Sequence, residues 1–421
     1  MARPLFESAI CHLPSHGLRT RISFMLSSLP AYQILLALSI FVGSCCWLLV
    51  LICAPFFRSR KFEGVVCFRD LPPVSLLKPV YGLEKNLQVN LRSACLQDYP
   101  DYQVVYSVQR PDDPALELLS DLERQFGSER VTVVIASVRV GVNGKVNNLA
   151  GALPHARHET LVISDSDVLL RPDFLRQIVA PLADRDVGAV STFFRGCHAG
   201  SWYEHIEQLT LNADQFSMAM VASATGLVDF CFGASTALTK TTLARIGGLE
   251  GLGDFLVEDT EMGRRIQALG KKLIDIPYLV DTTVDLGGAS HWWQKQTYWE
   301  QNSRVALPYL YSASSLLRII PLALLFAILR GADPLSLWIL GSVILLRLSA
   351  VAAVLGLALR DYAGLRRLWL VPIKDLLSVI WFVRALVSSR VVWRGIEMSL
   401  ARDGRLTVRR SRSAVQTERA P

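Results

Sequence analysis

Charged residues are scarce in this chain: they make up 19% of its 421 residues, whereas hydrophobic residues make up 51%. Soluble proteins carry about 25% charged residues. The shortage is uneven, because residues 61–304 have an ordinary mixture of charges and the apolar excess lies toward the two ends. This distribution excludes one uniformly soluble protein and predicts a soluble domain flanked by membrane segments.

Two further features are absent. The eight cysteines lack the spacing of metal ligands, which argues against a zinc site and a disulfide framework. No stacking motif accompanies the basic residues behind the net charge of +7, so attraction to anionic lipid headgroups explains that charge better than nucleic-acid binding does. We therefore expect a lipid bilayer as a partner and no nucleic acid.

A long uncharged stretch lies between Arg21 and Arg58. Within it, Ile34–Phe57 has about the 20 residues that a helix needs to cross a bilayer. A cleavable signal peptide would have a shorter apolar run nearer the start, whereas 33 residues precede this one. We expect a retained membrane anchor at residues 34–57, after an N-terminal segment at residues 1–33.

Residues 305–390 are expected to form further transmembrane or interfacial helices, although each apolar segment contains charge. The segments are Val305–Leu329 with Arg318, Leu335–Leu359 with Arg347, and Leu368–Val387 with Lys374 and Asp375. The tail, residues 391–421, and the flank after the anchor are both basic, and basic flanks prefer the cytoplasmic side. An even number of crossings then separates them, so one late segment should be interfacial or re-entrant.

Residues 62–304 alternate between short apolar runs and helical patterns. Strands are expected at Val74–Val80, Gln103–Val108, Val131–Ala136 and Leu161–Ser164, and helices at Glu84–Cys95 and Leu116–Phe126. This alternation predicts an α/β domain with a largely parallel sheet. In such sheets ligands bind beyond the carboxyl ends of the strands.

Two motifs could bind a diphosphate. Asp165 and Asp167 follow a predicted strand, where two carboxylates can hold Mg²⁺ or Mn²⁺ while the metal bridges the phosphates. The alternative is a solvated turn, but the preceding strand favours the metal site. Lys145 lies in the motif VNGKVNN and could pair with a phosphate, or belong to a solvated loop that opens a helix.

Two motifs have competing interpretations. Glu258 and Asp259 begin a predicted helix, where acidic residues are common because the helix dipole favours them; a carboxylate beside an apolar surface is also a candidate general base. The stretch Ser290–Arg304 has three tryptophans in eight residues. It is either an aromatic belt at the membrane interface or a lid that covers a diphosphate with Lys295 or Arg304.

Six motifs in order resemble those of the ceramide glucosyltransferase family, which includes bacterial relatives acting on sphingolipids and hopanoids. They are KPVYGLEKNLQVNL, DYPDYQVVYSVQRPDDPA, VGVNGKVNNLAGAL, ISDSDV, GGLEGLGDFLVEDTEMGRRI and the tryptophan-rich stretch. The resemblance runs from about Val74 to Arg304, and the tail through VVWRG is also similar.

The resemblance implies a GT-A nucleotide-sugar-binding fold with a Rossmann-like mixed sheet at residues 62–304. It implies inverting transfer from a UDP-sugar, with glucose as the default, to the primary hydroxyl of ceramide. The protein would be a multi-pass integral membrane protein with its active site on the cytosolic face, in the inner membrane of a bacterium or the Golgi of a eukaryote.

The same resemblance assigns roles to residues. On the donor side, Asp112 and Asp113 fall near the uridine, Lys145 beside the phosphates, and Asp165 and Asp167 at the metal. On the acceptor side, Asp259 falls at the base that removes the hydroxyl proton, and Glu258 supports it. Trp299 is preferred as the tryptophan of the closing motif, while Lys295 and Arg304 both stay open as its cation.

Two departures concern the donor. Arg110 stands where the family has an acidic residue, and the closing motif reads Lys295-Gln-Thr-Tyr-Trp299, with a second frame at Gln301–Val305. Glucuronic acid, galactose and N-acetylglucosamine therefore remain possible sugars. An acidic sugar would be helped by an extra cation such as Arg110 or Arg195.

Other functions fit less well. A processive polysaccharide synthase shares several motifs but needs more membrane helices for a polymer channel, and a hopanoid glycosyltransferase differs only in its acceptor. A transporter would have paired helical repeats, which the sequence lacks. A non-catalytic nucleotide-binding module would be expected to lose an acidic position, yet Asp165, Asp167 and Asp259 are all present.

Overall fold

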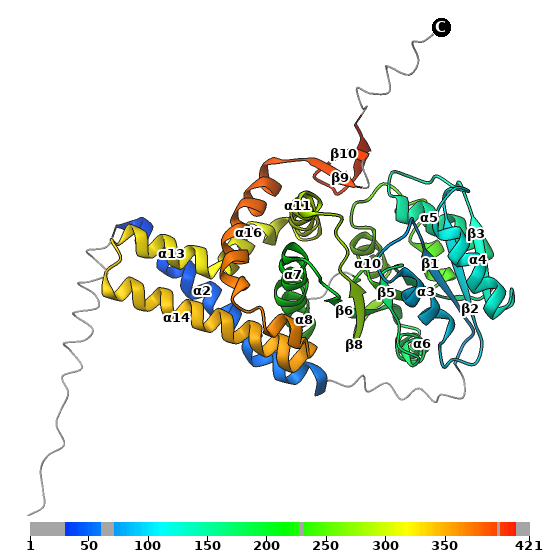
Figure 1. Cartoon of the computed structure of the whole chain (residues 1–421), viewed down its shortest axis with the longest axis horizontal. Helices are drawn as coiled ribbons and strands as arrows, with labels where there is room; N and C mark the ends of the chain where they lie inside the picture. The colour runs from blue at the N-terminus through cyan, green and yellow to red at the C-terminus, as the bar shows by residue number, and fades with distance from the viewer. Residues whose placement is uncertain (1–29, 60–70, 227–230, 394–395, 410–421) are drawn as a thin grey trace, which may run out of the picture.

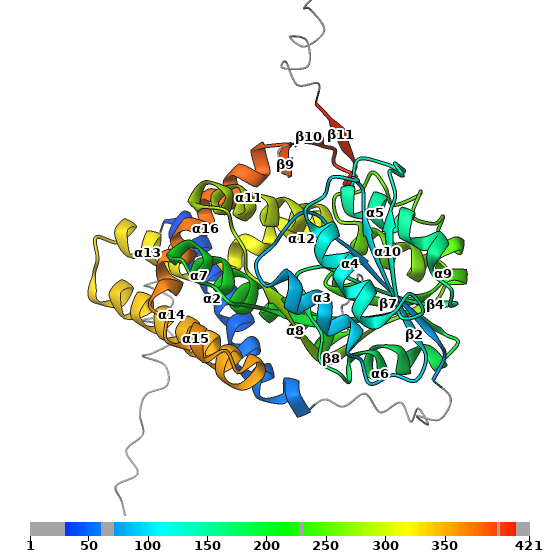
Figure 2. The same cartoon turned by 45° about the vertical axis from the view of Figure 1, so that its right-hand side comes forward.

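The computed structural model describes residues 30–59, 71–226, 231–393 and 396–409 (Figure 1). Most of the predicted N-terminal segment lies outside the described residues, as do Arg60 and Lys61 after the anchor and the basic residues Arg410 and Arg412 of the tail. The described part has a sheet covered by helices on one side of the molecule and a bundle of long apolar helices on the other (Figures 1 and 2).

Half of the main sheet is parallel, as predicted. It contains β1 (Val74–Pro79), β2 (Tyr102–Val108), β3 (Val131–Ile135) and β4 (Thr160–Ser164), in the order β3-β2-β1-β4. The predicted bounds of these strands are within two residues of the observed ones. The strands read as continuous apolar runs because both faces are covered: Leu76 packs into one hydrophobic cluster and Leu77 into another.

The other half makes the sheet mixed rather than largely parallel. It contains β5 (Val168–Leu169), β6 (Val187–Cys197), β7 (Ser235–Thr239) and β8 (Lys272–Thr283), and the complete order is β3-β2-β1-β4-β7-β6-β8-β5. The strand β7 runs antiparallel to both β4 and β6. This reversal pairs Ser164 at the end of β4 with Ser235 at the start of β7. The residues that follow β4 and those that precede β7 therefore lie at the same edge of the sheet.

Helices cover both faces of the sheet. The helices α3 (Leu87–Cys95), α4 (Ala115–Phe126) and α6 (Phe174–Val179) contribute to one cluster, and α5 (Gly144–Ala152), α9 (Lys240–Arg245) and α10 (Glu258–Ala268) to the other. The α3 helix begins at Leu87 instead of the predicted Glu84, because Asn86 has a left-handed backbone with φ of 62°.

A middle layer joins the sheet to the apolar bundle (Figure 1). It comprises α7 (Trp202–Leu209), the π-helical segment η4 (Thr210–Gln215), α8 (Phe216–Thr225), α11 (Ala289–Ala306) and α16 (Leu370–Val387). Phe193 of β6 and Trp292 of α11 belong to the same hydrophobic cluster as the apolar bundle. The sheet domain and the bundle therefore share a continuous core.

The bundle contains α2 (Ala31–Cys53) with the 3₁₀ helix η1 (Ala54–Ser59), α13 (Ile319–Leu329), and α14 (Pro334–Ala353) with the π-helical segment η6 (Val354–Leu359). Among the described residues, two helical stretches, Ala31–Arg58 and Pro334–Leu359, are long and apolar enough to cross a membrane. The predicted segment Val305–Leu329 is not one helix: it is divided among the end of α11, α12 (Pro308–Tyr311), η5 (Ala313–Leu317) and α13.

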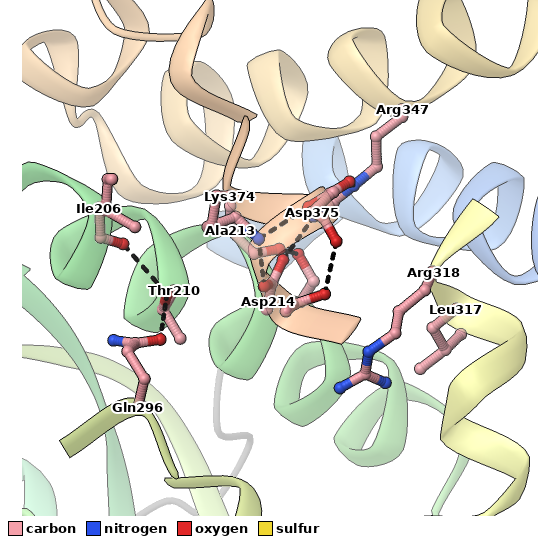
Figure 3. A network of polar contacts seen from close by, with 12 residues as sticks. Ile206, Thr210, Ala213, Asp214, Gln296, Leu317, Arg318, Arg347, Lys374 and Asp375 are labelled. Carbon is pink, nitrogen blue, oxygen red and sulfur yellow. Dashed lines mark hydrogen bonds and ion pairs between the residues drawn. The ribbon is translucent and has the colours of Figure 1, made fainter. Parts of the chain in front are cut away.

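The charges in the two later apolar segments meet in one network (Figure 3). Arg347 of α14 lies 2.8 Å from Asp375 of α16, and it also contacts Asp214 of η4 at 2.5 Å. Lys374 pairs with both aspartates, and the guanidinium of Arg347 stacks over the Trp47 ring of α2 at 3.7 Å. Two cations and two anions thus neutralise one another where the sheet domain meets the bundle.

A small antiparallel sheet follows α16. Its strands are β9 (Arg390–Trp393), β10 (Ile396–Leu400) and β11 (Leu406–Val408), and a short helix, α15 (Tyr362–Leu365), precedes α16. The backbone of Leu406 donates to Asp254 at 2.7 Å, and that of Leu256 donates to Gly404 at 3.0 Å. The small sheet therefore holds the loop that leads into α10.

Candidate active site

The D-x-D turn follows β4 at the junction with β7. The backbone amide of Asp165 donates to Ala234 at 3.2 Å. Below the turn, the fully buried amine of Lys78 donates to the backbone oxygens of Asp165 at 2.7 Å and Val168 at 3.2 Å. We did not predict this role for Lys78, although a lysine inside an apolar strand was a usable signal.

The carboxylates of this turn suit a divalent cation. Burial, with the neighbouring Asp165 and Glu84, raises the pKa of Asp167 to about 7, which marks an excess of negative charge that a cation would relieve. The donors are all oxygens, as Mg²⁺ and Mn²⁺ prefer. Within the described ranges, no group of three or more histidine, cysteine, aspartate or glutamate side chains forms a metal site, so the two aspartates would need oxygens from another source.

Lys145 connects the D-x-D turn to the start of α10. Its amine lies 2.7 Å from Asp165 Oδ1 and 2.9 Å from Glu258 Oε1, and it donates to the backbone oxygen of Gly233 at 3.3 Å. Burial lowers the pKa of Lys145, but the surrounding carboxylates Asp165, Glu258 and Asp259 raise it well above its usual value. The amine is therefore a permanent cation at the centre of the site.

The motif around Lys145 places it by local hydrogen bonds. Asn143 caps α5, because its Oδ1 accepts from the backbone amides of Lys145 and Val146 at 2.9 and 3.3 Å. The other end of the Asn143 amide donates to Glu258 Oε2 at 3.1 Å and to the Phe255 backbone at 2.9 Å. We had not singled out Asn143; an asparagine directly before the first residue of a helix carries the signal of a helix cap.

Glu258 and Asp259 form the first turn of α10, as predicted. Asp259 Oδ1 accepts from the amide of Thr260 at 2.7 Å. Burial, reinforced by Glu258 and opposed by Lys145, raises the pKa of Asp259 to about 7. Gly233 lies against this carboxyl, because a β-carbon there would come within 2.2 Å of Asp259 Oδ2. Asp259 thus has the pKa of a base that works near neutral pH.

Asp112 and Asp113 have different surroundings. Asp113 is buried and accepts from the backbone amides of Gly82 at 3.0 Å and Ala115 at 2.9 Å, so it ties the loop after β1 to the turn after β2. Asp112 is exposed and paired with Arg110, whose hydrogen bond lowers the pKa of Asp112. Contact of either aspartate with uridine stays a prediction.

The closing motif lies on α11. Lys295 acts electrostatically on Asp167, and its amine lies 5.9 Å from the centre of the Trp299 ring. Burial raises the pKa of Tyr298 to about 12, and Glu258 and Asp259 add to that increase; the side chain packs against the hydrophobic cluster that contains Leu256, two residues before Glu258. Arg304 instead donates to the backbone oxygens of Ala385 and Leu386 at the end of α16.

Arg195, the other cation considered for an acidic sugar, is engaged elsewhere. Its guanidinium lies 2.7 Å from Asp281 and also donates to the backbone oxygen of Leu359. It therefore joins β6 and β8 to the end of the second long apolar helix. The donor sugar stays open, because Arg110 is exposed and already paired.

The arrangement can hold a diphosphate and remove a proton. A cation, Lys145, lies between the metal-type carboxylates and a carboxyl of raised pKa, Asp259. The first could balance charge on a leaving phosphate, and the second could accept a proton from an attacking hydroxyl. These are the requirements of glycosyl transfer from an activated donor.

The chain is similar in sequence to known glycosyltransferases. The chain is 28% identical over 203 residues to ceramide glucosyltransferase 1 of Caenorhabditis elegans, covering 48% of this chain and 43% of the relative. It is 26% identical over 231 residues to ceramide glucosyltransferase 3 of the same organism, covering 54% and 50%. The chain spans about half the length of the curated relatives that it matches.

The fold is shared with a solved glycosyltransferase. A mannosyltransferase from Pyrobaculum calidifontis, determined in complex with GDP-Man and Mn²⁺, aligns with a TM-score of 0.54 and 21% identity, over 85% of this chain and 98% of that enzyme. This likeness confirms a GT-A-like fold with a mixed sheet. The profile of glycosyl transferase family 21 matches residues 32–406, and the chain therefore belongs to that family.

Proposed function

We propose that this protein is an inverting glycosyltransferase that moves a sugar, glucose by default, from a UDP-sugar to the primary hydroxyl of ceramide. The observation that carries the proposal is Lys145, whose amine bridges Asp165 and Glu258 at 2.7 and 2.9 Å beside Asp259. Similarity to ceramide glucosyltransferases supports the choice of acceptor.

In the proposed reaction the acceptor hydroxyl attacks the anomeric carbon from the side opposite the UDP. Asp259 accepts the hydroxyl proton as the new bond forms, and Glu258 keeps Lys145 and Asn143 in place beside it. Lys145 and Lys295 carry the positive charge that stabilises UDP as it leaves. A single displacement of this kind inverts the anomeric configuration.

Asp165 and Asp167 would hold Mg²⁺ or Mn²⁺, which when bound would neutralise charge on the diphosphate. The Mn²⁺ in the complex of the mannosyltransferase from Pyrobaculum calidifontis supports a metal of this type. Lys78 supports the same turn from below through the backbone.

We propose a membrane-bound enzyme whose active site faces the cytosol. Two helices of sufficient length and apolar composition, Ala31–Arg58 and Pro334–Leu359, supply two crossings. Only the second of these helices lies between the basic flank after the anchor and the basic tail, so a further crossing between them is needed to keep both flanks on one side. The broken stretch from α12 to α13 would supply it, since α13 packs against α2 and α14, and the charged helix α16 would lie at the interface, where the lipid acceptor resides.

The first test is to express the full chain in a host that lacks glycosphingolipids, supply ceramide, and analyse the lipids by mass spectrometry. We expect a new hexosylceramide, and no product from Asp259→Asn, which should still bind UDP-sugar because the base acts after the donor is bound. The loss should be at least ~100-fold.

A mass increment of a uronic acid or N-acetylhexosamine would change the donor sugar but keep the mechanism. Absence of any glycosylceramide from the folded, membrane-inserted protein would contradict ceramide as the acceptor. Full activity of Asp259→Asn would contradict its role as base.

A further inference from the structure

Glu207 of α7 is a completely buried carboxylate that faces α11. One oxygen, Oε1, accepts from the indole nitrogen of Trp299 at 2.8 Å and lies 3.8 Å from the amine of Lys295. The other oxygen accepts from the side-chain amide of Gln296. Its described contacts thus go to three residues of one helix, and all three belong to the closing motif.

These contacts set the rotation of α11 about its own axis. Residues three and four apart lie on one side of a helix, so fixing Gln296 and Trp299 against α7 also fixes where Lys295 and Tyr298 point. Lys295 is then close enough to act electrostatically on Asp167, and Tyr298 packs against the hydrophobic cluster that contains Leu256, two residues before Glu258. A rotation of α11 would carry both side chains away from the acidic site.

The contact is supported from behind by η4. The hydroxyl of Thr210 lies 3.2 Å from Gln296 Oε1 and 3.0 Å from the backbone oxygen of Ile206, and these two acceptors share its single proton (Figure 3). Because Thr210 holds the oxygen of the Gln296 amide, the nitrogen is directed to Glu207. An ionised or polar buried side chain is costly unless it is hydrogen-bonded, so this complete set of partners gives Glu207 a defined position.

We propose that Glu207 is a positioning residue for the nucleotide-sugar site: it holds α11 in the orientation that presents Lys295 and Trp299 to the donor diphosphate. This inference rests on the proposed function, since it assigns the closing motif to donor binding. Glu207 itself touches neither donor nor acceptor; it acts through the helix.

The test compares Glu207→Gln, which keeps the size of the side chain but removes its charge, with Glu207→Leu, which removes both acceptor atoms. We expect kcat/KM to fall by roughly tenfold for the first and by roughly 100-fold for the second, as for buried hydrogen bonds to a charged group. The loss should appear in the KM for UDP-sugar and in UDP binding measured by calorimetry on the full chain, while the KM for ceramide stays unchanged.

Glu300→Gln is the matched control. Glu300 lies on the same helix and accepts from Tyr311 at 2.9 Å and from Arg318, so its loss weakens the attachment of α11 without affecting the contact with α7. We expect an unchanged KM for UDP-sugar. The double variant Glu207→Gln with Gln296→Glu exchanges the two side chains, so that a carboxylate on α11 accepts from an amide on α7. It should recover much of the lost UDP affinity.

An unchanged KM for UDP-sugar in Glu207→Gln and Glu207→Leu would overturn the inference, and so would an equal increase in Glu300→Gln, which would indicate a merely structural effect. If Glu207→Leu fails to fold, the KM for UDP-sugar of Glu207→Gln and of the double variant decides whether Glu207 positions α11. A wild-type protein that binds UDP but does not glycosylate ceramide contradicts the acceptor in the proposed function; weaker UDP binding by Glu207→Gln would still support the role of Glu207.

Discussion

The carboxyl of Asp259 has a pKa of about 7 because burial and Glu258 raise it more than Lys145 lowers it. Only the ionised form accepts a proton, so a raised pKa predicts low activity in acid and a rate that increases as the pH rises through about 7. The measurement is kcat against pH in membranes, with binding of UDP-sugar followed separately. A rate that is level from pH 5 to 8, roughly two units on the acid side of the transition, would contradict Asp259 as the base.

Gly233 sets the space available to the same carboxyl. In Gly233→Ala the new methyl group would lie 2.2 Å from Asp259 Oδ2, so the carboxyl must move, and a misplacement of about 1 Å can cost ~100-fold in rate. We expect that loss in kcat, with UDP binding retained. The control is Gly144→Ala, where the nearest atom to the added carbon is Gln109 Oε1 at 3.9 Å; equal activity of the two variants would contradict the steric argument.

At the scale of elements, the small C-terminal sheet acts on the active site through one loop. Leu256, which precedes α10, packs with Val391, Met398, Leu400 and Leu406 in a separate hydrophobic cluster. Backbone hydrogen bonds from Leu256 to Gly404 and from Leu406 to Asp254 join this loop to β11 and to the turn before it. The strands β9 to β11 therefore determine where α10 begins, and with it the position of Asp259.

Leu406→Ala should loosen that loop. Leu406 is 2% exposed, and such a truncation in a core costs about 2–5 kcal/mol, so we expect lower kcat and faster hydrogen exchange in the loop before α10. Val408→Ala, on the same strand but 48% exposed, should change stability by less than about 0.5 kcal/mol. Equal exchange rates for the loop in the two variants would show that β11 does not hold it.

At the scale of the whole molecule, the charge network of Figure 3 fastens the catalytic domain to the apolar bundle. Asp214 comes from the π-helical segment η4 between α7 and α8, whereas Arg347, Lys374 and Asp375 come from α14 and α16. Charges in an apolar environment are retained where they pair. The network therefore fixes how the two parts of the protein meet.

Asp375→Asn should destabilise the whole protein, because Arg347 and Lys374 are then left with one shared carboxylate. Removing one partner of a buried ion pair costs about 3–5 kcal/mol, which should appear as a lower midpoint of thermal unfolding in detergent. Arg390→Gln breaks an exposed pair with Glu397 and should cost at most about 1 kcal/mol. Equal midpoints for the two variants would contradict a fastening role.

Local sequence predicted the features that depend on neighbouring residues. The runs VSLLK and LVIS specify buried strands, and the acidic residues that follow LVIS and begin α10 were recognised from those positions. Long apolar stretches predicted α2, which carries no charge, and α14, which carries only Arg347, because the length and composition of a stretch decide whether it can cross a bilayer. The family resemblance was confirmed by the match of glycosyl transferase family 21 to residues 32–406.

Tertiary structure decided which of these residues meet. The amine of Lys145 reaches carboxylates 20 and 113 positions away along the chain, Lys295 pairs with Glu207 while Arg304 contacts the end of α16, and β7 reverses to make the sheet mixed. None of these follows from spacing, because a side chain's partner depends on the packing of distant elements. The sequence by itself determined the strands, the long apolar helices and the supply of charged groups, whereas only the fold determined the pairs that those groups form.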